Sequence, residues 1–335
     1  MSSSSLSGEF RDSTQTSGSG ERSSVCDLCG AANVVEVLAL GRRALVECSG
    51  CGLVRLDPIT TSDELHAVYE EGDYYTTRPP VISDDFAERL RVAVLRTFWG
   101  YGNGTDSASS AVLRILLRPL KYRVMPVPFP RGLPVLDIGC GNGQRLLELQ
   151  HFGHTQLYGV EPTGGAARQA QRATEATIYP TTLEEAPLQP AHFGLVIMNQ
   201  VLEHVPSPRT TLRNVRSLLR ADGTLYLTVP NFGSLEARVF GEHWAGLRIP
   251  EHLHHFTPRA LRRLIEESGF RIVTWRTDTV LSITQETIGT WERASGGGWW
   301  RRLFVRLPGY MLAPATLAAD LCGRGQMLRI VAVCK

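Results

Sequence analysis

The stretch "VLDIGCGNG", residues 135–143, decides the fold of this chain of 335 residues. Its first four residues predict a short apolar strand, and Gly139, Gly141 and Gly143 predict a tight turn directly after it. The following "QRLLELQHFG" has the pattern of a helix that ends at Gly153. A strand, a glycine turn and a helix in this order bring backbone N–H groups close to a ligand, and the start of the helix favours a carboxylate or a phosphate.

Further apolar runs follow this turn and alternate with helical patterns. They are "QLYGVEP" (156–162), "FGLVIMNQV" (193–201), "GTLYLTVPN" (223–231), "RIVTWRT" (271–277) and "QMLRIVAVCK" (326–335). Apolar strands that alternate with helices predict a doubly wound α/β sheet, mainly parallel, which binds ligands at the carboxyl ends of its strands. Glu161 ends the second strand, where a carboxylate can accept hydrogen bonds from both hydroxyls of a ribose.

The glycine turn and two later stretches share their pattern with a known family. "VLDIGCGNG", "YGVEP" and "FGLVIMNQVLEHVPSP" together resemble the motifs of class I S-adenosylmethionine-dependent methyltransferases, and the resemblance covers residues 133–278. It implies a Rossmann-like sheet of seven strands with S-adenosylmethionine in the glycine turn. It further implies these cofactor-binding residues: Asp137, Gly139, Cys140, Gly141, Asn142 and Gly143 at the methionine end, Glu161 and Pro162 at the ribose, Thr182 and Leu183 at the adenine, and Asn199 and Gln200 near the sulfonium.

Four cysteines near the N-terminus form two C-x2-C pairs, "CDLCG" and "CSGCG". Their spacing is that of a zinc ribbon, and the glycine after each pair lets the backbone curl under a metal. Four thiolates would form a closed tetrahedral site, which suits a structural Zn2+ and leaves no position for catalysis. The alternatives are four unrelated buried thiols or a redox pair. The predicted ligands are Cys26, Cys29, Cys48 and Cys51.

Composition divides the chain into five parts. The first 24 residues are rich in serine, glycine and threonine, which predicts a disordered tail, and they lack the apolar core of a secretion signal. The predicted parts are this tail (1–24), the zinc ribbon (25–58), a helical connector and lid (59–132), the methyltransferase core (133–278), and a C-terminal helical flap with the last strand (279–335).

Charge and hydropathy restrict the partners of the chain. A net charge of +2 is too small to indicate a basic surface for binding nucleic acid, so we expect no nucleic acid partner. The apolar stretch at 303–322 is interrupted by Arg306, Pro308 and Asp320, so we expect no transmembrane segment and a cytoplasmic protein. Residues 298–323 are expected to form a flap packed on the core. The alternative, which the tryptophans and arginines beside the apolar stretch would favour, is peripheral contact with a membrane surface or a lipid-linked glycan.

Three histidines and a glutamate occur within "PEHLHHFTP", residues 250–258. Thr257 is a good N-cap and Pro258 suits the first helical position, so the histidines are expected on a loop before a helix. Methyl transfer to a hydroxyl, or to a carbon beside a carbonyl, needs a base, and histidine is the usual one. His252 and His204 are the candidate bases, with a structural contact as the alternative for each. A metal site is disfavoured because the loop offers no convincing further ligand.

The order of the segments resembles a narrower group. A cysteine ribbon, a methyltransferase core and then "PEHLHHFTPRALRRLIEESGF" resemble bacterial zinc-containing methyltransferases, whose relatives include sugar C-methyltransferases and enzymes of cell-surface glycan and natural-product pathways. By this resemblance, Glu251 and His252 are a catalytic pair, and Tyr74 or Tyr75 is a further catalytic group.

We therefore expect methyl transfer from S-adenosylmethionine to carbon or oxygen of a small molecule, with a histidine base. The expected acceptor is a sugar, a nucleotide sugar, or an intermediate of glycan or natural-product synthesis. The alternatives are an RNA methyltransferase that uses the ribbon as a reader, and a non-catalytic scaffold that binds S-adenosylmethionine.

Overall fold

The computed structural model describes residues 25–61, 64–65, 79–101, 111–118, 126–128, 132–294 and 316–335. The expected N-terminal tail, Tyr74 and Tyr75, and most of the segment expected to contact a membrane lie outside these residues. The interpretations placed on them therefore stay predictions.

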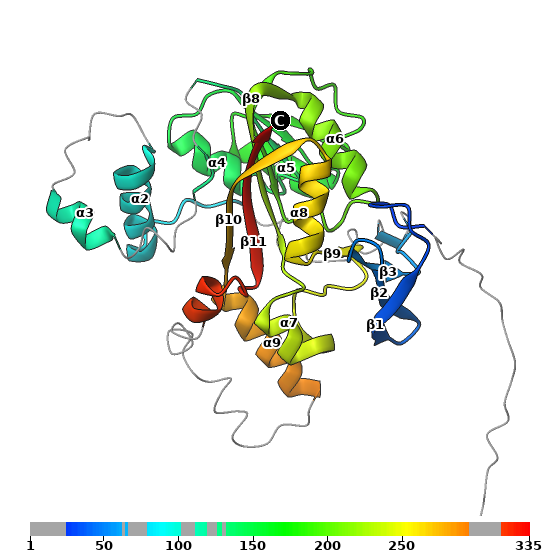
Figure 1. The fold of residues 1–335 in the computed structure, drawn as a ribbon. Helices are drawn as coiled ribbons and strands as arrows, with labels where there is room; N and C mark the ends of the chain where they lie inside the picture. Colours follow the sequence, from blue (N-terminus) through cyan, green and yellow to red (C-terminus); the bar gives the residue numbers. More distant parts are fainter. Residues whose placement is uncertain are drawn as a thin grey trace, which may run out of the picture.

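A seven-stranded sheet forms the centre of the molecule (Figure 1). Its strands, in the order β10-β11-β8-β7-β4-β5-β6, are β10 (Phe270–Asp278), β11 (Met327–Cys334), β8 (Leu219–Pro230), β7 (Phe193–Asn199), β4 (Val135–Ile138), β5 (Leu157–Val160) and β6 (Thr177–Tyr179). Strand β11 runs antiparallel to both of its neighbours, whereas the pairs from β8 to β6 are parallel. The predicted Rossmann-like α/β fold is confirmed. Strand β6 is so short that its apolar pattern gave no signal of its own.

Helices cover both faces of this sheet, because successive strand residues point to opposite sides. Leu136 and Val196 pack with α6 (Pro208–Leu218) and α8 (Pro258–Glu267) in one apolar cluster. Val135, Leu195 and Ile197 pack with α4 (Gln144–His151) and α5 (Gly164–Ala173) in a second one. Helix α8 begins as expected: the side chain of Thr257 accepts a hydrogen bond from the N–H of Ala260.

The N-terminal strands form a separate sheet. In the order β1-β2-β3-β9 it consists of β1 (Val34–Leu40), β2 (Arg43–Cys48), β3 (Val54–Asp57) and β9 (His254–His255), all paired antiparallel. Strand β9 corrects the expectation that the histidine run is a plain loop, because two of its residues complete the sheet of the ribbon. Figure 1 shows β9 beside the blue strands at the N-terminal end of the described chain.

The remaining elements surround the two sheets. The expected connector contains α2 (Phe86–Trp99) and α3 (Ala111–Leu117). Helix α7 (Leu235–Phe240), the 3-10 turn η3 (Gly241–His243) and α9 (Leu281–Ala294) contact one another at one end of the central sheet (Figure 1). Residues 316–321 are helical and lead towards β11. Within the described residues, no helix is long and apolar enough to cross a membrane.

Candidate active site

The glycine turn after β4 is held against the neighbouring strand. The N–H groups of Gly139 and Cys140 both donate to the carbonyl of Val160, at 2.8 and 3.1 Å. Gly139 has a φ of +66°, and a Cβ there would lie 2.6 Å from Cγ2 of Val201, so no other residue fits without displacement. The turn therefore brings backbone to the edge of the sheet without a side chain in the way.

Two acids lie beside this turn. The carboxylate of Glu161 accepts hydrogen bonds from the N–H groups of Gly141 (2.9 Å) and Thr163 (2.8 Å). Asp137, on β4, is buried, and burial raises the pKa of its carboxyl to about 7, although the charge of Arg145 acts in the opposite direction. Both acids are thus close to the backbone amides that the resemblance assigns to the cofactor.

The other predicted cofactor residues lie at the same edge. Asn199 ends β7, and its side-chain oxygen accepts a hydrogen bond from the hydroxyl of Thr228 at 2.6 Å. Gln200 follows with a φ of +58°, which is uncommon for a residue with a side chain, and its buried Nε2 has no partner among the described residues. The exposed Pro162 and Thr182 and the half-buried Leu183 follow β5 and β6.

A pocket lies next to Gln200 at this edge. Gln200 follows β7, Pro230 ends β8 and Met327 begins β11, so three strands of the central sheet contribute to it. The rest of its wall comes from the segment before β9 and from α9. Its lining residues are Gln200, Pro230, Trp244, Ala245, Gly246, Arg248, His252, Ile283, Glu286, Gln326 and Met327.

His252, in this pocket, lies in a cluster with two residues that follow β7. Its Nδ1 is 2.9 Å from the carbonyl oxygen of Gly246. The ring of His204 is perpendicular to that of His252, with centroids 4.6 Å apart, and its Nδ1 is 3.1 Å from the carbonyl oxygen of Glu251. Glu203 is fully buried, and neither of its carboxylate oxygens has a hydrogen-bond partner in the part of the chain that the structure describes.

Burial sets the protonation of this cluster. It lowers the pKa of His252 well below its ordinary value, aided by the neighbouring His204 and His255, and lowers the pKa of His204 to about 4. Burial also raises the pKa of Glu203 to about 8, against the opposing charge of Arg248. At neutral pH both imidazoles are therefore neutral, and the carboxyl of Glu203 holds its proton. A neutral imidazole that donates from Nδ1–H to a carbonyl has an unprotonated Nε2, which can accept a proton.

The fold brings two further possible metal ligands, from outside the histidine loop, next to His252. One ligand atom each from Glu203, His204 and His252 lie within 4.8 Å of one another. A carboxylate with two imidazoles is a donor set that can bind divalent cations, while the expectation that this loop is no metal site stays a prediction. Sequence reasoning missed Glu203 because nothing in "LEHV" indicates that its carboxyl is buried.

The rest of the histidine run has different contacts. The carboxylate of Glu251 pairs with Nε of Arg248 at 3.3 Å, while the carbonyl of Gly246 is what contacts Nδ1 of His252. His254 and His255 are buried, and burial lowers the pKa of each, to about 4 and about 3. These two lie on β9 and pack inside the molecule. Tyr75, the other predicted catalytic residue, is outside the described residues.

The four cysteines come together as the spacing predicts. Sγ of Cys26 lies 3.5 Å from Sγ of Cys51, Sγ of Cys29 lies 3.5 Å from Sγ of Cys48, and all four sulfurs are within 4.8 Å of one another. Sulfurs that surround a tetrahedral Zn2+ lie about 3.8 Å apart. A Cβ on Gly50 would lie 3.1 Å from Sγ of Cys29, so the backbone fits closely around the sulfurs.

The two knuckles have matching geometry. The N–H of Gly30 donates to the backbone carbonyl of Cys26, and the N–H of Gly52 donates to the backbone carbonyl of Cys48, both at 2.8 Å. Both glycines have a φ of +74°. At Cys48, burial acts to raise the thiol pKa, but the backbone N–H groups of Cys51 and Gly50 bring it down to about 7, whereas burial raises the thiol pKa of Cys26 and of Cys51. The fit to a tetrahedral metal therefore rests on the positions of the four sulfurs.

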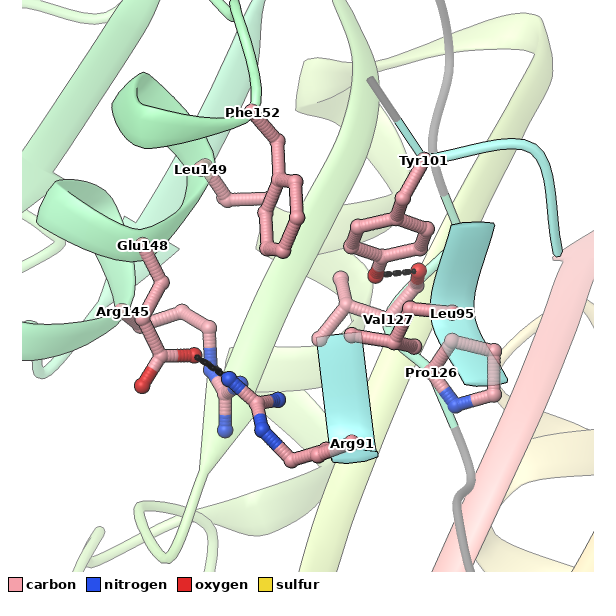
Figure 2. A pocket seen from close by; sticks show the side chains of 9 residues that line it. All are labelled: Arg91, Leu95, Tyr101, Pro126, Val127, Arg145, Glu148, Leu149 and Phe152. Carbon is pink, nitrogen blue, oxygen red and sulfur yellow. Dashed lines mark hydrogen bonds and ion pairs between the residues drawn. The ribbon is translucent and has the colours of Figure 1, made fainter. Parts of the chain in front are cut away.

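A second hollow lies between α2 and α4 (Figure 2). Its volume is about 20 Å³, which is room for about one water molecule. The hydroxyl of Tyr101 donates to the carbonyl of Val127 there, and Nη2 of Arg91 pairs with Glu148 at 3.5 Å. Its small volume and internal pairing exclude this hollow as the acceptor site.

Comparison with known proteins places the described site in a family. A family model described as "Methyltransferase domain" matches residues 109–274. A ubiquinone biosynthesis O-methyltransferase from Xanthomonas campestris pv. campestris (strain B100) is 27% identical over 188 residues, which cover 53% of this chain and 77% of the relative. The corresponding protein from Aeromonas salmonicida (strain A449) is 28% identical over 152 residues, or 42% of this chain and 64% of the relative.

Solved structures are similar as well. An S-adenosylmethionine-dependent methyltransferase from Mesorhizobium loti aligns with a TM-score of 0.43 at 17% identity, over 64% of this chain and 96% of that one. One from Archaeoglobus fulgidus aligns with a TM-score of 0.43 at 17% identity, over 66% and 93%. The family match lies over the sheet and its glycine turn, so the chain carries a methyltransferase domain and is similar to methyltransferases that act on small molecules.

Proposed function

We propose that the chain methylates an oxygen or a carbon of a small, oxygen-rich acceptor, such as a sugar, a nucleotide sugar, or an intermediate of glycan or natural-product synthesis. The observation that carries this proposal is the pocket that Gln200 and His252 line together. Gln200 belongs to the edge assigned to the cofactor, and His252 is a neutral buried imidazole. A methyl donor and a proton acceptor on one pocket are what alkylation of a hydroxyl or an activated carbon requires.

The lining of the pocket favours an acceptor rich in oxygen. Nε2 of Gln200 and Nε1 of Trp244 are buried donors without a partner among the described residues, and Arg248 adds a guanidinium. Buried donors that stay unpaired are costly, and hydroxyl or carbonyl oxygens of an acceptor would satisfy them. The relatives named as ubiquinone biosynthesis O-methyltransferases support a small-molecule acceptor methylated at oxygen.

Each protein group has a defined part in the reaction. S-adenosylmethionine, when bound, supplies an electrophilic methyl group. The backbone of the glycine turn would border the methionine part of the cofactor, and Glu161 would accept from the ribose hydroxyls. Nε2 of His252 takes the proton of the acceptor, while the carbonyl of Gly246 holds the ring through Nδ1–H. His204 and Glu203 lie beside His252, and all three are buried.

We also propose that Cys26, Cys29, Cys48 and Cys51 hold a structural Zn2+. The sulfur separations and the paired knuckles support this assignment, because four thiolates saturate a tetrahedral ion. Thiolates that bind zinc persist in a reducing compartment, so we place the enzyme in the cytoplasm.

The test is a methyl-transfer screen with labelled S-adenosylmethionine against nucleotide sugars, phenolic hydroxy compounds and RNA. We expect transfer to one of the first two classes. Transfer to RNA alone would overturn the acceptor class, and binding of S-adenosylmethionine without any transfer would favour the scaffold alternative.

A second experiment, with a chelator, distinguishes a mechanism with a histidine base from one with a bound metal ion. We expect turnover, measured at once after addition of EDTA, to stay unchanged, because an imidazole base needs no cation. Immediate loss of turnover that Mg2+ or Mn2+ restores would overturn the base and assign Glu203, His204 and His252 to a cation.

A further inference from the structure

The loop that carries His252 is built on the cysteine ribbon. Strand β3 pairs with β9 so that Val54 faces His255 and Arg55 faces His254. The N–H of Leu56 then donates to the carbonyl of Leu253 at 3.0 Å. The backbone on the C-terminal side of His252 is therefore a strand of the ribbon's sheet.

A second anchor holds the other side of the same loop. Thr60 is buried, and its hydroxyl donates to the carbonyl of Pro250 at 2.7 Å. Nη1 of Arg43, from β2, donates to that hydroxyl oxygen at 2.9 Å, which fixes its orientation. His252 thus lies between two points, Pro250 and Leu253, that the ribbon holds.

The ribbon also packs against a residue of the pocket wall. Leu45, Val54 and Leu56, from β2 and β3, are in one buried apolar cluster with Trp244 and Leu247. Trp244 lines the pocket, and the neighbouring Gly246 contacts Nδ1 of His252. Packing from the ribbon therefore reaches both the pocket wall and the carbonyl that orients the base.

The cysteines determine where these strands lie. Cys48 ends β2, and its N–H donates to the carbonyl of Leu53 at 2.9 Å, so the second knuckle is the turn between β2 and β3. The other knuckle is docked on the core: the guanidinium of Arg209 donates to the carbonyl of Leu28. A metal that joins the two knuckles would hold the hairpin β2–β3 against the body of the enzyme.

We propose that the cysteine ribbon positions the acceptor side of the pocket. Thr60, two residues beyond the ribbon, is the positioning residue, and a metal bound to the four cysteines would hold the ribbon in place. This rests on the proposed role of His252. The cofactor turn is held differently, by Val160 on β5 and by its contact with Val201. Loss of the ribbon's hold should therefore displace His252 while S-adenosylmethionine still binds.

The first experiment compares Thr60→Val with Thr60→Ser and with Thr155→Val, an exposed threonine outside the ribbon and the histidine loop, in the full chain. Valine removes the hydroxyl at the same volume, whereas serine keeps it. We expect Thr60→Val to lower kcat by about 10- to 100-fold with KM for S-adenosylmethionine unchanged, because small misplacements of reacting groups are costly. Thr60→Ser and Thr155→Val should keep the kcat of the wild type. Equal loss in Thr60→Ser, or unchanged kcat in Thr60→Val, would overturn the role of Thr60.

The second experiment needs no acceptor. Bound zinc is measured in the purified chain, then removed by prolonged incubation with a strong chelator. Amide hydrogen exchange and the affinity for S-adenosylmethionine are followed before and after. We expect faster exchange of residues 250–256 and of β3, unchanged protection of β4 and β5, and unchanged affinity. A chain that contains no metal, or metal loss without faster exchange at 250–256, would overturn the proposal.

The two proposals fail in different ways. If His252→Gln retains full turnover, His252 is not the base, yet the exchange experiment still reports whether the ribbon holds the loop. If His252→Gln is inactive while exchange at 250–256 is independent of metal, the base stands and the positioning role fails.

Discussion

The two sides of the active site are built in opposite ways. The cofactor side consists of β4, the glycine turn, α4 and β5, which follow one another within residues 135–161. The acceptor side combines β3 of the ribbon, the residues after β7, the segment 244–255, α9 and the start of β11. One side is a local motif, whereas the other is assembled from segments far apart in the chain. A change at one side should therefore leave the other intact, and four predictions follow from this comparison.

The largest effect is expected at His252. His252→Gln removes the proposed base, so turnover should fall by about 10²- to 10⁴-fold, while the affinity for S-adenosylmethionine stays near that of the wild type. His151→Gln, an exposed histidine at the end of α4, is the control. Labelled methyl transfer and calorimetric titration measure the two quantities. Unchanged turnover would remove His252 from the mechanism.

The converse effect is expected at Gly139. Gly139→Ala places a Cβ where φ is +66° and Val201 is 2.6 Å away, so the turn must shift. Strain of this kind amounts to about 1–3 kcal/mol, and we expect about tenfold or weaker binding of S-adenosylmethionine by calorimetry. Gly165→Ala is the control, because a Cβ there meets nothing within 4 Å. Equal binding by both variants would show that the turn does not hold the cofactor.

A pH-dependent effect on stability is expected at Glu203. Burial raises the pKa of its carboxyl from 4.5 to about 8, so folding takes up a proton, and stability falls as pH rises towards 8. Near pH 6.5 the histidines of the unfolded chain are still partly protonated, and Asp137 and Cys48 have pKa values of about 7, so the contribution of Glu203 is taken from the difference between Glu203→Gln and the wild type. Glu203→Gln should therefore show a shallower decline of Tm between pH 6.5 and 8 than the wild type. The exposed Glu175→Gln should follow the wild type, and a slope equal to that of Glu203→Gln would contradict the burial argument.

The smallest effect is expected at the helix starts on the two sides. Thr257 caps α8 with a side-chain hydrogen bond, whereas Thr163 at the start of α5 makes none. Thr257→Ala should lower the free energy of unfolding by about 1 kcal/mol, and Thr163→Ala by less. Denaturant titration of the two variants measures the difference. Equal losses would show that the cap of α8 contributes nothing specific.

Local sequence patterns were sufficient to predict the elements of the cofactor side and the clustering of the four cysteines. Gly139 and Glu161 belong to a strand–turn–helix–strand unit whose geometry follows from neighbouring residues, and their role at the cofactor stays a prediction. The cysteine pairs form knuckles because each C-x2-C-G closes its own turn. Strand β6 escaped prediction because three residues carry too little periodicity to be distinguished from a loop.

The arrangement of the acceptor side could not be predicted from local sequence patterns. In the sequence, "PEHLHHFTP" precedes a capped helix, and nothing in it indicates pairing with β3 or burial of His254 and His255. Glu203 is one acid among many until the fold removes it from water and places it beside His252.

The sequence by itself determined the methyltransferase sheet, the cofactor turn and the cysteine cluster, because the forces that form them act between residues close in the chain. Only the tertiary structure decided that the ribbon supports the histidine loop and that His204 and Glu203 lie next to His252. Those contacts depend on strand pairing and burial between distant segments, which no local pattern records.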